Sequence, residues 1–326
     1  MKKNILLIMP KFVSMESYVS FGLERLGYQV IFWEDDYSVS NWPILSRLAP
    51  PLAKWVSQRF YSKKVSEIAH LKIDVVLVVK GSEIKGNVIT EIRNLQPLAR
   101  FVLYLWDSVH NSPNGLDIAP QFDRVFSFDS KDSIDYGFTF RPIFFPDHLH
   151  SEIKRSKSLK TVFFLGSYHS DRISKLDDLA KAVPESYSTD FSLLRGRVRC
   201  MLDDILHRNR GRQSVKIISK RLEHKDVLLK MAASAAVLDI NHDGQSGLTQ
   251  RAAECLFLET KLITDNKSVI GYDFYNPANI NLIDLSGDND FTEFLQRPYE
   301  PVDSHIVNRY SLSYWIEEIL ETDGNL

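Results

Sequence analysis

Short apolar runs alternate with amphipathic helical patterns along most of the 326 residues of this chain. Short apolar runs of this kind are typical of strands buried on both faces, and helices between them are typical of parallel sheets. We therefore predict a strand at each apolar run. The predicted strands are 4–9, 29–33, 74–79, 100–105 and 124–128 in the first half, and 161–165, 215–218, 236–240, 261–264 and 279–283 in the second.

The connections between these strands show helical periodicity. In SMESYVSFGLERLGY, apolar side chains recur at helical spacing and Gly27 is a suitable stop. A polar, basic stretch at 145–160 is predicted to be a linker, and the alternation resumes after it. The fold class is therefore predicted as α/β with two Rossmann-like domains, residues 1–150 and 151–308, followed by a helix over 310–320.

Composition excludes several classes of protein. The chain has 40 Lys and Arg against 42 Asp and Glu, a formal net charge of −2, which gives no general attraction to nucleic acid. Two cysteines are too few for a disulfide framework or a thiolate metal site. The N-terminal apolar stretch is interrupted by Pro10 and Lys11, unlike a secretory signal. We expect a cytoplasmic protein with no nucleic-acid partner.

The stretch NHDGQSGLTQRAAEC joins a glycine loop to the start of a helix, directly after a predicted strand. Loops at the carboxyl ends of parallel strands line the ligand crevice. Thr249 is a candidate N-cap, and the N–H groups of Gly247, Leu248 and Thr249 are predicted to face a phosphate. Arg251 adds a guanidinium, and Glu254 accepts hydrogen bonds from a ribose on the ligand side of the helix. An ordinary glycine loop with a capped helix and a surface glutamate is the alternative.

The segment GLTQRAAECLFLETKLIT resembles the C-terminal donor-binding segment of GT-B glycosyltransferases. The segments FFLGSYHSDRISKLDDL and DNKSVIGYDFYNPANI resemble bacterial capsule and O-antigen glycosyltransferases related to the spore-maturation glycosyltransferase group. The resemblance implies two domains facing across a cleft, with the donor in the C-terminal domain and the acceptor in the N-terminal one. It also implies that Glu254 binds the ribose, and that residues 309–326 form a helix returning toward the N-terminal domain.

The same resemblance implies residues for the donor diphosphate. Arg172 matches the cation that neutralises the leaving group where no metal does so, with a solvated helix residue as the alternative. Lys220 and Arg221, after another predicted strand, are rival cations. The loop residues before Arg172 are also predicted to bind the donor: Gly166, Tyr168 and His169. Ser246 stands where the retaining pattern has a second glutamate, which leaves the anomeric outcome open.

The candidate catalytic residues come from the first half. In VLYLWDSVHNSP, Asp107 follows a predicted strand and an aromatic side chain, so it is a candidate general base for a sugar hydroxyl, and His110 is a candidate acid–base group. A helix or turn cap is the alternative for Asp107, and Asp129 in FSFDSKDS is interpreted as a cap. Without an HExxH or a functional DxD pattern, we expect no metal and no cofactor.

Two regions are strongly basic in this otherwise nearly neutral chain. The stretch 42–66 combines aromatic and cationic side chains and contains no acid, and the stretch 193–221 has nine Lys and Arg against two Asp. Cations and aromatic side chains together favour contact with an anionic membrane surface. Two short helices packed on the first domain are the alternative for 42–66.

The predicted function is transfer of a sugar from an activated, nucleotide-linked phosphate donor to a growing cell-surface polysaccharide or a lipid-linked glycan, without a metal. The expected partners are the activated donor, a saccharide or lipid-linked acceptor, and the inner face of the plasma membrane as a peripheral contact. One alternative is a transferase with a non-nucleotide donor such as phosphoribosyl pyrophosphate. Another, from a different class, is a non-catalytic α/β module that binds a nucleotide or a partner protein.

Overall fold

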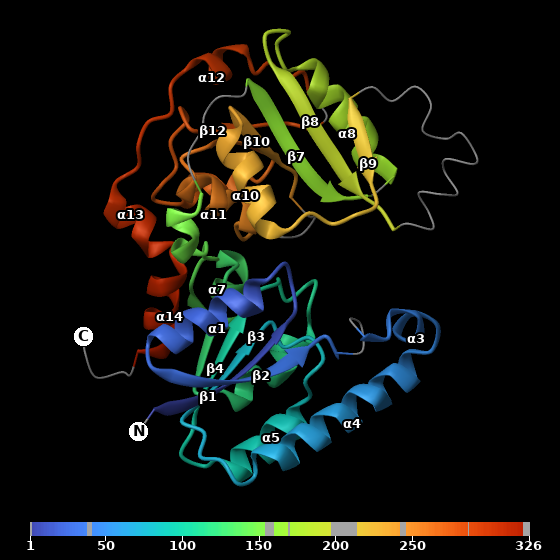
Figure 1. Ribbon diagram of the computed structural model, residues 1–326, viewed down its shortest axis with the longest axis vertical. Coiled ribbons are helices and arrows are strands. Elements are labelled where there is room, and N and C mark those ends of the chain that lie inside the picture. Colours follow the sequence, from blue (N-terminus) through green and yellow to red (C-terminus); the bar gives the residue numbers. More distant parts are fainter. Residues whose placement is uncertain are drawn as a thin grey trace. The chain divides into compact units, whose positions relative to one another are not determined.

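The computed structural model describes residues 2–37, 41–153, 160–168, 170–196, 214–241, 246–285 and 287–321. The chain forms two compact units. Unit 1 comprises Met1–Ile143, Asp243–Gly247 and Tyr310–Leu326, and unit 2 comprises Phe144–His242 and Leu248–Arg309. Each unit contains a six-stranded parallel sheet with helices, as Figure 1 shows, so the predicted α/β class with two Rossmann-like domains is confirmed.

The sheet of unit 1 has the strand order β2-β1-β3-β4-β5-β6, and all of its pairs are parallel. Its strands are β1 (Lys3–Pro10), β2 (Tyr28–Asp35), β3 (Val75–Val79), β4 (Arg100–Leu105), β5 (Arg124–Ser127) and β6 (Thr139–Phe140). Its helices are α1 (Met15–Arg25), α3 (Pro43–Leu48), α4 (Pro50–Ile68), α5 (Gly86–Leu95), α6 (Asn114–Ile118), η1 (Ala119–Gln121), α7 (Ser130–Tyr136) and α14 (Leu312–Leu320).

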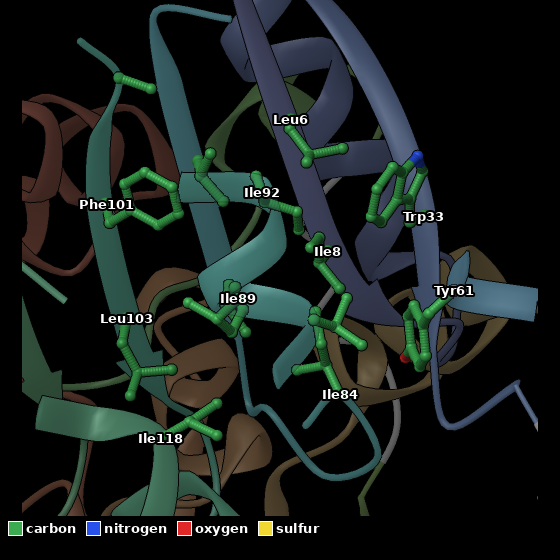
Figure 2. Close-up of a cluster of buried hydrophobic side chains, with 14 of the residues drawn as sticks. Leu6, Ile8, Trp33, Tyr61, Ile84, Ile89, Ile92, Phe101, Leu103 and Ile118 are labelled. Carbon is green, nitrogen blue, oxygen red and sulfur yellow. The ribbon is translucent and has the colours of Figure 1, made fainter. Parts of the chain in front are cut away.

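One face of this sheet is covered by α4 and α5. Alternate residues of β1, Leu6 and Ile8, point into a cluster that also contains Tyr61 of α4 and Ile89 of α5, all buried. Figure 2 shows these side chains together, with Trp33 of β2 beside Tyr61. Because successive side chains of a strand point to opposite faces, the other face needs a separate cover.

That other face is covered by α1 and α14. Trp315 of α14 packs edge-on against Tyr104 of β4, with ring centres 4.8 Å apart. At Gly22 of α1, an added Cβ would lie 2.5 Å from Ile316 Cδ1, so the two helices approach at a residue without a side chain. Helix α14 therefore belongs to the core of unit 1.

The sheet of unit 2 has the strand order β12-β11-β10-β7-β8-β9, and its pairs are also parallel. Its strands are β7 (Thr161–Ser167), β8 (Ser188–Leu194), β9 (Val215–Ile218), β10 (Ala236–Asp239), β11 (Lys261–Thr264) and β12 (Ile280–Leu282). Its helices are η2 (Asp147–Ser151), α8 (Ser170–Lys181), α10 (His224–Ala233), α11 (Gln250–Phe257), η3 (Lys267–Gly271), α12 (Thr292–Gln296) and α13 (Ser304–Arg309).

The first part of the predicted linker packs into unit 2. Phe145 stacks on Phe257 of α11 with ring centres 4.4 Å apart, and Leu149 and Ile153 are also buried. Residues 154–159 lie outside the described residues. The polar composition of this stretch thus conceals apolar anchors at about every fourth position.

Each strand predicted from an apolar run coincides with an observed strand, and two observed strands had no such signal. Strand β6 has only two residues at the edge of its sheet. Strand β8, STDFSLL, mixes polar and apolar residues because only Phe191 and Leu193 are buried. The stretch 42–66, for which two short helices were the alternative interpretation, contains the 6-residue α3 and most of the 19-residue α4.

Candidate functional site

The strand order of unit 2 reverses between β7 and β10. From β7 the chain continues to β8 and β9 on one side, whereas β10, β11 and β12 lie on the other. In open parallel sheets, ligands bind outside the carboxyl ends of the strands at such a reversal. The candidate donor site is therefore the segment that follows each of β7 and β10. Of the predicted donor residues, Tyr168, Leu248 and Thr249 lie in the described parts of the loops, and Arg172, Arg251 and Glu254 lie in the helices that follow, α8 and α11.

Asp239, the last residue of β10, organises the start of α11. Thr249 Oγ1 donates to Asp239 Oδ2 at 2.7 Å and accepts from the N–H of Ala252 at 3.1 Å. The predicted N-cap is therefore confirmed. Asp239 itself is almost fully buried, and Arg251 Nη1 lies 3.1 Å from its Oδ1. A buried carboxylate needs such a partner, so this ion pair fixes the loop end of α11.

Arg251 also connects β10 to β7. Its Nη2 donates to the carbonyl oxygen of Leu165, while Nη1 pairs with Asp239. Its guanidinium carbon lies 5.4 Å from the centre of the Phe164 ring, and 22% of the side chain is exposed. The guanidinium group thus lies at the strand-order reversal, partly accessible to an anion.

A second guanidinium reaches the end of β7. Arg172 Nη1 donates to the carbonyl oxygen of Ser167 at 3.3 Å. A Cβ at Gly166 would lie 2.7 Å from Phe164 Cζ and 3.2 Å from Arg172 Nη1, so the close approach requires glycine. Arg172 therefore faces back toward the strand end.

Other predicted donor residues lie around this strand end. The N–H of Tyr168 donates to the carbonyl oxygen of Leu194 at 2.9 Å. The guanidinium carbon of Arg195 lies 3.9 Å from the centre of the Tyr168 ring. Lys220 is exposed after β9, the edge strand, with β8 between β9 and β7. His169 lies outside the described residues. Arg195, after β8, is a cation that the sequence interpretation missed.

Glu254 differs from the surface glutamate of the alternative interpretation. It is only 4% exposed, and its Oε1 lies 2.7 Å from Nε2 of His224, the first residue of α10. An ionised carboxylate only accepts hydrogen bonds, so this contact requires a proton on Nε2. His224 therefore orients the Glu254 carboxylate from within the fold. This pairing was not predictable from sequence spacing, because the two residues are 30 positions apart.

Gly247 also differs from the expectation. Its N–H donates to Asp129 Oδ2 at 2.9 Å, and the N–H of Ser246 donates to the same oxygen at 2.8 Å. A Cβ at Gly247 would lie 2.4 Å from the ring of Phe128, so this position excludes any side chain. The N–H predicted to face a phosphate is thus bound to a carboxylate within unit 1. Leu248, the next predicted residue, is buried.

Asp129 has two roles in unit 1. It caps α7, accepting the N–H groups of Lys131 and Asp132, which confirms its interpretation as a cap. Burial raises its pKa, but hydrogen bonds from the Ser246 hydroxyl and from the N–H groups of Ser246 and Gly247 outweigh burial. The pKa of Asp129 therefore lies below its usual value.

The candidate catalytic residues follow β4 in unit 1. Asp107 Oδ1 accepts from the N–H of Ser108 at 3.0 Å and from Asn111 Nδ2 at 3.2 Å. Those contacts are typical of a turn, and the side chain stays partly exposed. His110 is exposed in the same turn. Trp106 packs edge-on against Phe12 with ring centres 6.4 Å apart, so the loops after β1 and β4 are in contact.

Among the described residues, no group of three or more His, Cys, Asp and Glu side chains could hold a metal ion. Over the same residues, no helix combines the length and the apolar character needed to cross a membrane.

A scan against protein-family models finds no match, and a search of curated proteins finds none. Solved structures do match over nearly the whole chain. The Anabaena protein HepE in complex with UDP and glucose is similar with a TM-score of 0.60 and 13% identity, covering 98% of this chain and 99% of that chain.

Two further matches have different activities in their names. The UDP-GlcNAc 2-epimerase of Methanocaldococcus jannaschii, in complex with UDP-GlcNAc and UDP, has a TM-score of 0.54 and 13% identity over 98% of this chain and 99% of that chain. The trehalose-phosphate synthase (UDP-forming) of Burkholderia vietnamiensis has a TM-score of 0.58 and 10% identity over 96% and 95%. At such low identity these matches establish the fold, which is GT-B.

Proposed function

We propose that the protein is a glycosyltransferase that takes a sugar from a nucleoside diphosphate donor bound by unit 2. The observation that carries the proposal is that two guanidinium groups meet at the end of β7: both Arg172 and Arg251 donate to main-chain carbonyl oxygens of this strand. In a reaction without a metal, cations at this place would stabilise the charge that develops on the leaving diphosphate. The named ligands of the similar structures, UDP and UDP-GlcNAc, support a uridine nucleotide as the donor.

The ribose of this donor is assigned to Glu254. Its carboxylate has one oxygen held by His224 at 2.7 Å and lies in the second turn of α11. Thr249, Gln250 and Arg251 form the first turn, whose N–H groups favour an anion. Diphosphate at the helix start and ribose along its side would therefore suit one nucleotide.

The acceptor is assigned to unit 1, with Asp107 as the general base. A carboxylate at the carboxyl end of β4, partly exposed and held by Asn111, can accept a proton from a sugar hydroxyl. His110 in the same turn is the second candidate for proton transfer. We propose a saccharide of the cell surface, free or lipid-linked, as the acceptor.

Calorimetric titration with UDP, ADP, GDP and phosphoribosyl pyrophosphate tests the donor. We expect UDP to bind best, and an Arg172→Met variant to bind it about tenfold or more weakly, because a charge-assisted hydrogen bond is lost. Tighter binding of phosphoribosyl pyrophosphate than of any nucleotide would show that the donor is not a nucleotide sugar. Binding without any turnover or donor hydrolysis would favour a non-catalytic module.

Epimerisation is a second candidate activity, since UDP-GlcNAc 2-epimerases are among the similar structures. Incubation with UDP-GlcNAc separates the two activities. A glycosyltransferase transfers the sugar to its acceptor, or more slowly to water, and releases UDP as the leaving group. An epimerase changes the configuration of the sugar. Formation of the 2-epimer of UDP-GlcNAc would overturn the transferase proposal.

We also propose that α3 and α4 contact an anionic membrane surface. Large apolar side chains are exposed there: Trp42, Ile44, Leu48, Leu52 and Trp55. Arg59 lies over the Trp55 ring at 5.2 Å, so cation and aromatic share this face. Aromatic side chains enter the interface and cations gain from anionic lipid.

Sedimentation with vesicles of anionic phospholipid measures this contact. Ile44→Ser and Leu48→Ser should each weaken binding, because these side chains are 74% and 78% exposed. Leu98→Ser is the matched control, since Leu98 is 90% exposed outside α3 and α4. Equal binding of all three variants, or equal binding to zwitterionic vesicles, would count against a membrane contact.

A further inference from the structure

A pocket of about 400 Å³ lies in unit 1 between α4 and the loop from β3 to α5. This volume is within the range of small-molecule sites. Residues of α4 form one wall, and residues 82–85 with the start of α5 form the other. The polar side chains of the lining include Lys54, Ser57, Tyr61, Ser82, Glu83 and Lys85.

The lining combines three kinds of chemistry. Lys54 and Lys85 contribute two ammonium groups, which favour an anion such as a phosphate or a carboxylate. Glu83 contributes a carboxylate, which accepts hydrogen bonds from hydroxyl groups. Ala53 and Val88 contribute apolar surface, against which the C–H groups of a sugar ring pack. A saccharide that carries an anionic group matches all three.

Both walls of the pocket are fixed to one buried carboxylate. Asp35, the last residue of β2, is 0% exposed. It accepts the N–H groups of Ser82 at 2.6 Å and Glu83 at 3.0 Å from the loop, and the hydroxyl of Tyr61 at 3.2 Å from α4. The Tyr61 hydroxyl and the Ile84 N–H both donate to Asp35, and Figure 2 shows these two residues at the same end of the buried cluster. The pocket is therefore held in shape by hydrogen bonds.

Two more contacts fix groups that line the pocket. Ser57 Oγ donates to Glu83 Oε2 at 2.7 Å, which joins α4 to the loop a second time. Lys85 Nζ donates to Asn114 Oδ1, and Asn114 Nδ2 donates to the carbonyl oxygens of Gly81 and Ile84. One lysine and the carboxylate are thus oriented before any ligand binds, which lowers the entropic cost of binding.

The chain around the pocket is also strained. Asp36 has φ 59° and Lys80 has φ 76°, both in the left-handed region, and their side chains form an ion pair at 3.2 Å. Left-handed conformations of non-glycine residues are concentrated at functional sites. They follow β2 and β3, at the carboxyl edge of the sheet where ligands of parallel sheets bind.

We propose that this pocket binds an anionic saccharide, and that this saccharide is the acceptor. The assignment as acceptor rests on the proposed glycosyltransferase function, whereas binding itself does not. Lys54 and Lys85 would hold the anionic group, while Glu83 and the serine hydroxyls would hold the sugar hydroxyls. A neutral sugar makes no ion pair with the lysines, and a bare anion makes no hydrogen bond to Glu83, so each should bind more weakly.

Nuclear magnetic resonance of the full chain tests this with glucose 6-phosphate, glucose and inorganic phosphate as probes. Glucose 6-phosphate should shift the backbone amide signals of Ala53, Ser57 and Ser82 in a saturable way. Its affinity should exceed that of either of the other probes by about tenfold or more. An equal response to inorganic phosphate would show a simple anion site and overturn the saccharide assignment.

Variants of α4 provide the control. Lys54→Met should weaken glucose 6-phosphate about tenfold, whereas Lys63→Met, exposed on α4 outside the pocket lining, should not. UDP affinity is measured in the same samples. If UDP binds but glucose 6-phosphate leaves the pocket signals unchanged, the pocket proposal falls alone. If glucose 6-phosphate binds and UDP does not, the donor proposal falls and the pocket stands as a saccharide site.

Discussion

The two units use buried carboxylates differently at the carboxyl edges of their sheets. In unit 2, Asp239 at the end of β10 is paired with the guanidinium of Arg251 at 3.1 Å. In unit 1, Asp35 at the end of β2 is surrounded by N–H groups and by the Tyr61 hydroxyl. At the edge of unit 2, the positively charged guanidinium group of Arg251 remains partly accessible to an anionic ligand. The hydrogen bonds at the edge of unit 1 instead fix a loop and a helix around a pocket.

The difference also appears in the electrostatics of Asp35. Burial, and secondly the neighbouring Asp36, raise its pKa above the ordinary value, and the three N–H groups offset this only in part. Hydrogen bonds alone thus leave the charge of a fully buried carboxylate incompletely compensated. Unit 1 retains this costly group because no neutral side chain of that size accepts so many donors.

The largest effect is expected from Arg251→Met, which removes the charged partner of Asp239. An uncompensated buried carboxylate costs about 3–5 kcal/mol, so unit 2 should unfold at markedly lower urea concentration. The double variant Asp239→Asn/Arg251→Met should recover part of the loss, since no buried charge is left. A loss below about 1 kcal/mol in the single variant would show that solvent, not Arg251, compensates Asp239.

Asp35→Asn should have the next largest effect, in unit 1. The amide replaces one accepting oxygen with a donor that faces other donors, which costs about 2–3 kcal/mol. Hydrogen exchange at Ser82, Glu83 and Ile84 should accelerate, because these N–H groups lose their acceptor. Tyr61→Phe is the milder control, at about 1 kcal/mol, since it removes one hydroxyl. Unchanged exchange in Asp35→Asn would refute the role of Asp35 in holding the loop.

The sequence predicted the framework of both units well because their buried strands are continuous apolar runs. The runs at 100–105, 215–218 and 261–264 coincide with the observed strands. Strand β8 escaped prediction because STDFSLL begins with three polar residues and shows neither a continuous apolar run nor strict alternation. The Thr249 and Asp129 caps were predictable because a cap acts within three residues of itself.

The partners of the site residues were not predictable, because they come from distant parts of the chain. His224 and Glu254 are 30 residues apart, and Asp129 and Gly247 are 118 apart. Spacing rules for helices and strands say nothing at such separations. The pocket in unit 1 was missed for the same reason: the contacts of Asp35 with residues 82–84 depend on the order of β2, β1 and β3 in the sheet.

Glu254→Gln is the next prediction, and it tests whether unit 2 has a ribose acceptor. Loss of the charged acceptor should weaken UDP about ten- to a hundredfold, or about 1.5–3 kcal/mol, in calorimetric titration. His224→Gln should weaken UDP less, because His224 acts only by orienting the carboxylate. Equal losses in the two variants, with reduced stability in both, would assign the pair to folding instead of to the donor.

The smallest effect is a difference in pH dependence between Asp35 and Asp129. Folding raises the pKa of Asp35 above its ordinary value of 3.8. The folded protein therefore keeps a proton on Asp35 at pH values where the unfolded chain has lost it. The Asp35 contribution to stability is therefore complete below that value and is lost as the pH rises through the raised pKa. The folded state lowers the pKa of Asp129, so its contribution is present above pH 3.8 and is lost as the pH falls through the lowered pKa.

Urea unfolding from pH 3 to pH 6, comparing the wild type with Asp35→Asn and Asp129→Asn, measures each contribution as a difference in unfolding free energy. The two differences should slope in opposite directions with pH, and slopes of the same sign would show that Asp35 is compensated as fully as Asp129.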